Sequence, residues 1–127
     1  MGTLRASLLN VAPGLVEIAL RPGPAISQQH GFVHAGAVSA IADTAAGYAA
    51  LSVMPPGRGV LTTEFKINLV APAAGDLILA RGKVVKAGRT LTLSQAEVLA
   101  IKDGREKLIA FLTATMMAIE GRDDVVD

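Results

Sequence analysis

The chain has 127 residues, of which 51% are hydrophobic, 18% charged and 3% aromatic, with a formal net charge of +1. This composition is typical of one globular domain, residues 1–127, and excludes a disordered chain. A nearly neutral chain with so few aromatic side chains also argues against nucleic-acid binding. Because it has no cysteine, disulfides, thiol nucleophiles and cysteine-based metal sites are excluded.

The N-terminal sequence, MGTLRASLLN, lacks the long apolar core of a secretory signal, so we expect a cytoplasmic protein. The most apolar stretch, Gly36 to Met54, approaches the length of a membrane span. It contains Asp43 and many Ala, Gly and Ser residues, which make a poor span. We therefore predict a core helix there and no membrane association.

The predicted elements follow one another in a simple order. Alternating apolar residues predict a strand over Val11 to Leu20. A loop from Ala25 to Ala35 precedes a helix that runs to about Val53, where Met54-Pro55-Pro56-Gly57 stops it. Four strands follow, and Gly88-Arg89 and Asp103-Gly104 are hairpin signals between them. They are predicted at Val60 to Val70, Leu77 to Ala87, Thr90 to Ile101 and Lys107 to Ile119.

Two of these strands carry further information. The first alternates strictly, which predicts Leu61, Phe65 and Leu69 on one face and Thr62 and Glu64 on the other. The last strand is apolar on both faces, so we predict that the chain oligomerises or that its sheet packs on another. One helix of about 16 to 18 residues inside a curled antiparallel sheet of five to six strands is an α+β hotdog fold.

The candidate functional residues lie at the start of the helix and within it. His34, Ala35 and Gly36 stand where the helix begins, and N–H groups of a first helical turn polarise carbonyl oxygens or bind anions. Asp43, about two and a half turns after His34, is predicted to flank the same cleft. It is the only charge in the helix and shares a small-residue stripe with Gly36 and Gly47. Such a carboxylate needs a partner or a function, although a solvent-facing stripe is an alternative.

The run Gly31-Phe32-Val33-His34-Ala35-Gly36, followed by Asp43, resembles the His-Gly-Gly and acidic-residue motif of hotdog-fold acyl-CoA thioesterases. It is most similar to the phenylacetate-degradation thioesterases. The stretch from Leu69 to Asp76 is also similar to this family's strand, Pro-Ala and Gly-Asp turn. The resemblance extends over Leu15 to Ile119. It implies hydrolysis of the thioester of a medium-chain, aryl or other hydrophobic acyl-CoA.

The resemblance also implies roles for individual residues. Asp43 is implied to be the catalytic carboxylate, as general base or as nucleophile. The N–H of Ala35 is implied to polarise the thioester carbonyl, where the family has glycine. Gly36 and Gly47 are assigned to substrate binding on the small-residue face. Other members carry Ser or Thr where this chain has Gly47.

Three polar side chains complete the implied catalytic set. Gln28 is implied to position the water or the thioester, with the neighbouring Gln29 as an alternative. Thr62 is implied to hold the water, and a one-residue register shift would exchange it with Thr63. The ring of His34 is assigned to supporting the helix start by hydrogen bonding, with catalysis by the ring as the less favoured alternative.

Basic residues near the cleft mouth are expected to hold the phosphates of CoA, and Arg89 in the Gly88-Arg89 turn is the first choice. As an alternative, such residues discourage aggregation at strand edges. His30, His34 and Asp43 lack a further clustered ligand, so we predict no metal site and no cofactor.

The resemblance implies a site built across at least a homodimer, and a homotetramer is favoured. The alternative function is a hotdog module that binds an acyl-CoA or a lipid without turnover. It is suggested by the alanine at position 35 and by the lack of a hydroxyl at Gly47.

Overall fold

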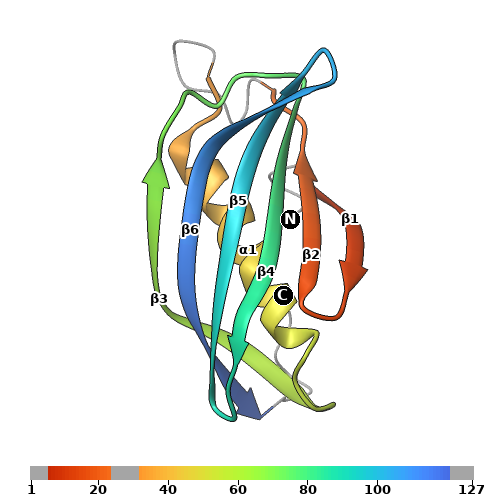
Figure 1. Cartoon of the computed structure of the whole chain (residues 1–127), viewed down its shortest axis with the longest axis vertical. Helices are drawn as coiled ribbons and strands as arrows, with labels where there is room; N and C mark the ends of the chain where they lie inside the picture. The colour runs from red at the N-terminus through yellow and green to blue at the C-terminus, as the bar shows by residue number, and fades with distance from the viewer. Residues whose placement is uncertain (1–5, 24–31, 121–127) are drawn as a thin grey trace.

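The computed structural model describes residues 6–23 and 32–120. One helix lies against the concave face of a curved antiparallel sheet, whose strand order is β1-β2-β4-β5-β6-β3 (Figure 1). This arrangement confirms the predicted hotdog fold, with six strands. The elements are β1 Ala6–Ala12, β2 Leu15–Leu20, α1 Ala35–Leu51, β3 Arg58–Leu69, β4 Leu77–Ala87, β5 Leu91–Lys102 and β6 Arg105–Glu120.

The prediction of a single strand over Val11 to Leu20 is wrong. The chain turns at Pro13 and Gly14, and Ala12 pairs with Leu15 across a tight hairpin. Gly14 has a φ of 76°, a conformation that glycine adopts without steric cost. Apolar residues stand on both sides of the turn, so the segment resembles one continuous strand.

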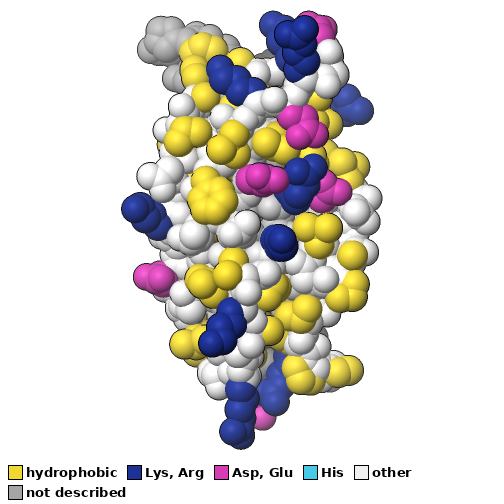
Figure 2. Space-filling view, in the orientation of Figure 1, with side chains coloured by type: hydrophobic (Ala, Val, Ile, Leu, Met, Phe, Trp, Pro, Cys, Tyr) yellow, Lys and Arg dark blue, Asp and Glu magenta, His cyan; other side chains and the backbone are white. Residues whose placement is uncertain are grey.

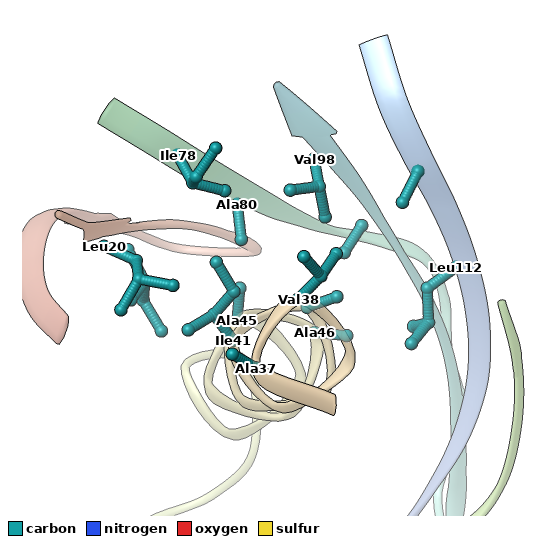
Figure 3. Close-up of a cluster of buried hydrophobic side chains, with 14 of the residues drawn as sticks. Leu20, Ala37, Val38, Ile41, Ala45, Ala46, Ile78, Ala80, Val98 and Leu112 are labelled. Carbon is teal, nitrogen blue, oxygen red and sulfur yellow. The ribbon is translucent and has the colours of Figure 1, made fainter. Parts of the chain in front are cut away.

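The helix packs very closely on the sheet because its buried side chains are small. Ala42, Ala45, Ala46 and Ala49 are fully buried. Figure 3 shows this side of α1 turned toward apolar side chains of the sheet. At Gly82 of β4, an added Cβ would lie 2.2 Å from the carbonyl oxygen of Ala45. The depth at which the helix sits therefore requires glycine at position 82.

Strand β3, at the edge of the sheet, does not alternate as predicted. Its pairing with β6 shifts between Thr62 and Glu64, which is the mark of a β-bulge. Thr62 pairs with the buried Met116, whereas Phe65 pairs with the buried Ala114. Thr62 and Phe65 therefore both face the helix side, and the predicted separation of these residues onto opposite faces is wrong.

The convex face of the sheet carries a group of charges away from the helix (Figure 2). Arg81 donates hydrogen bonds to Glu17 and Glu97, both at 2.9 Å. The bond to Glu17, followed by that to Glu97, raises the pKa of Arg81 above its ordinary value. The group joins β2, β4 and β5 on the face that does not contact α1.

We expect Gly82→Ala to destabilise the protein by about 3 kcal/mol or more, because its Cβ meets helix backbone that cannot move aside. Denaturant unfolding measures this change. Gly23→Ala is the matched control, since a Cβ at Gly23 would meet nothing within 4 Å. Equal stability of the two variants would contradict the proposed importance of the close helix approach.

Candidate functional site

The start of α1 is held from two sides. His34 is the N-cap residue, with φ −61° and ψ 138°, and its Nδ1 accepts a hydrogen bond of 2.9 Å from the N–H of Gly36. The N–H of Val33 donates to the carbonyl oxygen of Ala73 at 2.9 Å, which ties the preceding loop to the segment after β3. The His34 ring thus has the supporting position that the residue pattern indicates, with Nδ1 as the acceptor.

Ala35 is the first residue of the helix and is exposed. Its N–H makes no hydrogen bond to any residue within 6–23 and 32–120, as is usual for a first helical turn. Ala35 lies at a small apolar cleft with a volume of about 150 Å³. The cleft is lined by Phe32, Val33, Ala35, Val38, Leu69, Ala71, Pro72, Ala73 and Ile109.

Asp43 is half-buried, and its partner on the sheet is Thr62, as the resemblance implies. The hydroxyl of Thr62 donates to Oδ1 of Asp43 at 2.8 Å, and it also lies 3.2 Å from the sulfur of Met116. The hydroxyl of Thr63 instead donates to the backbone oxygen of Thr115 at 3.0 Å. The structure thus brings Thr62, rather than Thr63, to the carboxylate.

Ala35 and Asp43 do not flank one cleft within a single chain. Both belong to the continuous helix α1, and eight residues at 1.5 Å each separate them by about 12 Å along its axis. Asp43 is not among the residues that line the cleft at Ala35. The expectation of a shared cleft is therefore wrong for one protomer.

The two glycines assigned to substrate binding occupy different environments. Gly36 is exposed beside Ala35, and His34 already accepts the hydrogen bond from its N–H. Gly47 is buried, and a Cβ at this position would lie 3.8 to 3.9 Å from Met116 and Val60. Gly47 thus belongs to the helix–sheet contact, whereas Gly36 stays open to a ligand.

The turn between β4 and β5 lies at the end of the sheet near the C-terminal end of α1 (Figure 1), and Arg89 belongs to this turn. A row of cross-strand pairs runs from Ala87 through Thr92 and Met116 to Thr62. Three strand spacings, about 14 Å, separate β4 from β3 along this row. Arg89 follows Ala87 by two residues, so it lies nearer to the level of Asp43 than to the helix start.

Three of the candidate residues named from the sequence are not described by the structure. Gln28, Gln29 and His30 fall outside the described residues. Within the described parts, no three His, Asp or Glu side chains gather closely enough to hold a metal ion. Across the same residues, α1 included, no helix has the length and apolar character to cross a bilayer.

Met116 was not predicted as a site residue. Its contact with Thr62 depends on the register of β6 against the part of β3 that precedes the bulge. The sequence signals the strand but contains no signal for this register.

Solved structures of several bacterial proteins are similar to this chain. A thioesterase family protein of Silicibacter pomeroyi is 49% identical, with a TM-score of 0.92 over 95% of this chain and 89% of that chain. The phenylacetic acid degradation protein PaaI of Thermus thermophilus is 25% identical, with a TM-score of 0.79 over 92% of this chain and 96% of that chain. A Bacillus halodurans protein solved with CoA is 25% identical, with a TM-score of 0.74 over 81% of this chain and 66% of that chain.

Sequence comparison gives the same relationship. A Halobacterium salinarum protein named as an esterase is 35% identical over 75 residues, which are 58% of this chain. The match spans 49% of that relative's length. The sequence profile of the Thioesterase superfamily matches residues 30–107, more than half of the chain. The helix start, Asp43 and β3 through β5 all lie within this match, and the chain therefore belongs to the thioesterase superfamily.

Proposed function

We propose that this protein is an acyl-CoA thioesterase in which Asp43 is the catalytic carboxylate. The observation that carries the proposal is the hydrogen bond from Thr62 to Oδ1 of the half-buried Asp43, on a helix with no other charge. A partly buried carboxylate held by one donor keeps its second oxygen for a reacting group. Membership of the thioesterase superfamily supports thioester hydrolysis as the reaction.

The chemistry needs only two protein groups. In the general-base route, Asp43 takes a proton from water as the water oxygen attacks the thioester carbonyl. The N–H of Ala35 at the start of α1 stabilises the oxyanion, a contribution of about 10² to 10³ in rate. The carbon–sulfur bond then breaks, the CoA thiolate leaves and is protonated, and a carboxylic acid remains. In the nucleophilic route, an oxygen of Asp43 attacks the carbonyl, the carbon–sulfur bond breaks as the CoA thiolate leaves, and water hydrolyses the resulting mixed anhydride.

The cleft at Ala35 supports a hydrophobic acyl group of limited size. Its volume is about 150 Å³, and the described residues that line it are all apolar. An apolar cavity of roughly this volume accepts a benzene ring. We therefore infer an aryl or medium-chain acyl group. The relative solved with CoA supports CoA as the carrier of the acyl group.

Asp43→Asn and Asp43→Ala are each expected to slow thiol release from a panel of aryl, short-chain and long-chain acyl-CoAs by roughly 10² to 10⁴-fold. Both variants remove the base and the nucleophile, whichever route operates. A chromogenic thiol reagent follows the reaction. Asp103→Asn, in the β5–β6 turn, is the control and is expected to keep the parental rate.

Parental rates in both Asp43 variants would contradict the assignment of this carboxylate. Tight acyl-CoA binding without thiol release in the parental protein would instead support the alternative, a binding module without turnover. The absence of a hydroxyl at Gly47 carries less weight for that alternative, because Thr62 supplies a hydroxyl to Asp43 from the sheet.

We further propose that each site is built across a homodimer. The separation of about 12 Å between Ala35 and Asp43 within one helix means that one thioester cannot contact both in the same protomer. Among the described residues, no strand pairs with the outer edge of β3, and on its helix side Phe65 and Leu69 are 47% and 54% exposed. Apolar side chains at an open sheet edge favour burial against a second copy. The homotetramer stays a prediction.

Mixing two inactive variants tests the shared site. Ala35→Pro removes the N–H at the first helical position, where proline fits the helix, and Asp43→Ala removes the carboxylate. In a symmetric dimer with shared sites, refolding an equal mixture restores up to about one quarter of the parental thiol release. Each variant refolded alone is the control. No recovery in a mixture that forms heterodimers would contradict sites shared between protomers.

We assign the CoA phosphates to Arg89, which lies at the sheet end nearer to Asp43. We expect Arg89→Ala to raise KM roughly 5- to 20-fold with kcat unchanged, because a phosphate contact away from the reacting carbon contributes uniform binding. Arg105→Ala is the matched control. It removes a cation at the opposite end of the sheet, beside a hollow of about 670 Å³ also lined by Lys102 and Lys107. A rise in KM for Arg105→Ala alone would move the phosphate site to that hollow.

A further inference from the structure

Met116 touches the group that holds the proposed catalytic carboxylate. Its side chain is fully buried, and its sulfur lies 3.2 Å from the hydroxyl oxygen of Thr62. The same hydroxyl donates to Oδ1 of Asp43 at 2.8 Å. Met116 and Thr62 are also direct cross-strand partners in the β3–β6 ladder. Sulfur, hydroxyl and carboxylate therefore form one continuous chain of contacts from the core to the site.

The Met116 side chain lies beside the helix at Gly47. Gly47, one turn after Asp43, has no side chain, and a Cβ built there would lie 3.8 Å from Cε and 3.9 Å from Sδ of Met116. Gly47 therefore leaves a small space between the helix and the Met116 side chain. Val60 reaches the same place, with its Cγ1 at 3.9 Å from the built Cβ. An unbranched thioether is suited to fill such a gap.

A threonine hydroxyl has one proton to donate, and a carboxylate is a far better acceptor than a thioether. The proton is therefore directed to Asp43, while the sulfur occupies the other side of the Thr62 oxygen. A sulfur held at 3.2 Å limits the rotation of the Thr62 side chain away from Asp43.

We propose that Met116 is a positioning residue, which acts through Thr62 to hold Oδ1 of Asp43 and leave Oδ2 directed to the reactants. This inference rests on the proposed thioesterase function. It explains how a glycine at position 47 is compatible with an ordered carboxylate. Met116 itself contacts neither water nor thioester in this assignment.

The test is a kinetic double-mutant cycle of Met116→Leu and Thr62→Val, with thiol release from the best acyl-CoA of the panel. Leucine conserves the volume of methionine, so folding is expected to be retained. We expect Met116→Leu to lower kcat roughly 2- to 20-fold with KM unchanged, a range typical of contacting residues. Added to Thr62→Val, it should cause no further loss. Met117→Leu, one residue along β6, is the matched control and should keep the parental kcat.

Each outcome decides a different point. A parental kcat in Met116→Leu, or losses that multiply with those of Thr62→Val, would overturn the positioning role while leaving the thioesterase proposal intact. An equal loss in Met117→Leu would show a general effect of the strand and also overturn it. No thiol release from the parental protein would overturn the proposed function, and this inference with it. Thermal unfolding of every variant identifies losses that arise from instability.

Discussion

The distance between α1 and β4 is the constraint on which the other features depend. A side chain as small as one methyl group at Gly82 would collide with the helix backbone at Ala45. The helix face that meets the sheet is accordingly mostly alanine, with Val38 and Ile41 nearer the helix start. This close approach explains how a chain that is 51% hydrophobic needs only 3% aromatic residues. It also sets how near a short carboxylate such as Asp43 comes to the sheet.

Periodicity and turn chemistry predict most of the elements. Prolines at positions 55 and 56 end the helix region, and the Asp103-Gly104 turn has the positive φ values that its residues favour, 51° and 75°. Apolar residues on both sides of Pro13 and Gly14 conceal the hairpin there, because they resemble one continuous strand. Local signals therefore predict where elements lie better than where a strand reverses.

In the candidate site, too, local sequence predicts some residues, whereas others depend on strand pairing. The helix start and Asp43 lie close in sequence, so their spacing and chemistry can be recognised together. Thr62 and Thr63 are chemically equivalent, and only the bulge in β3 determines which hydroxyl reaches Asp43. Met116 lies 54 residues from Thr62 in the chain. No pattern within either strand specifies that contact, because it is created by the pairing of β6 with β3.

The bulge separates β3 into two segments with independent side-chain phase. Before it, the register orients Thr62 toward Asp43, and after it, the register orients Phe65 and Leu69 toward the open part of the inner face. In an uninterrupted strand, a register slip in either half would rotate every side chain of the other half. Here the bulge can absorb such a slip. Substitutions in the part of β3 after the bulge can thus change its side chains or register while the Thr62 hydroxyl stays beside Asp43.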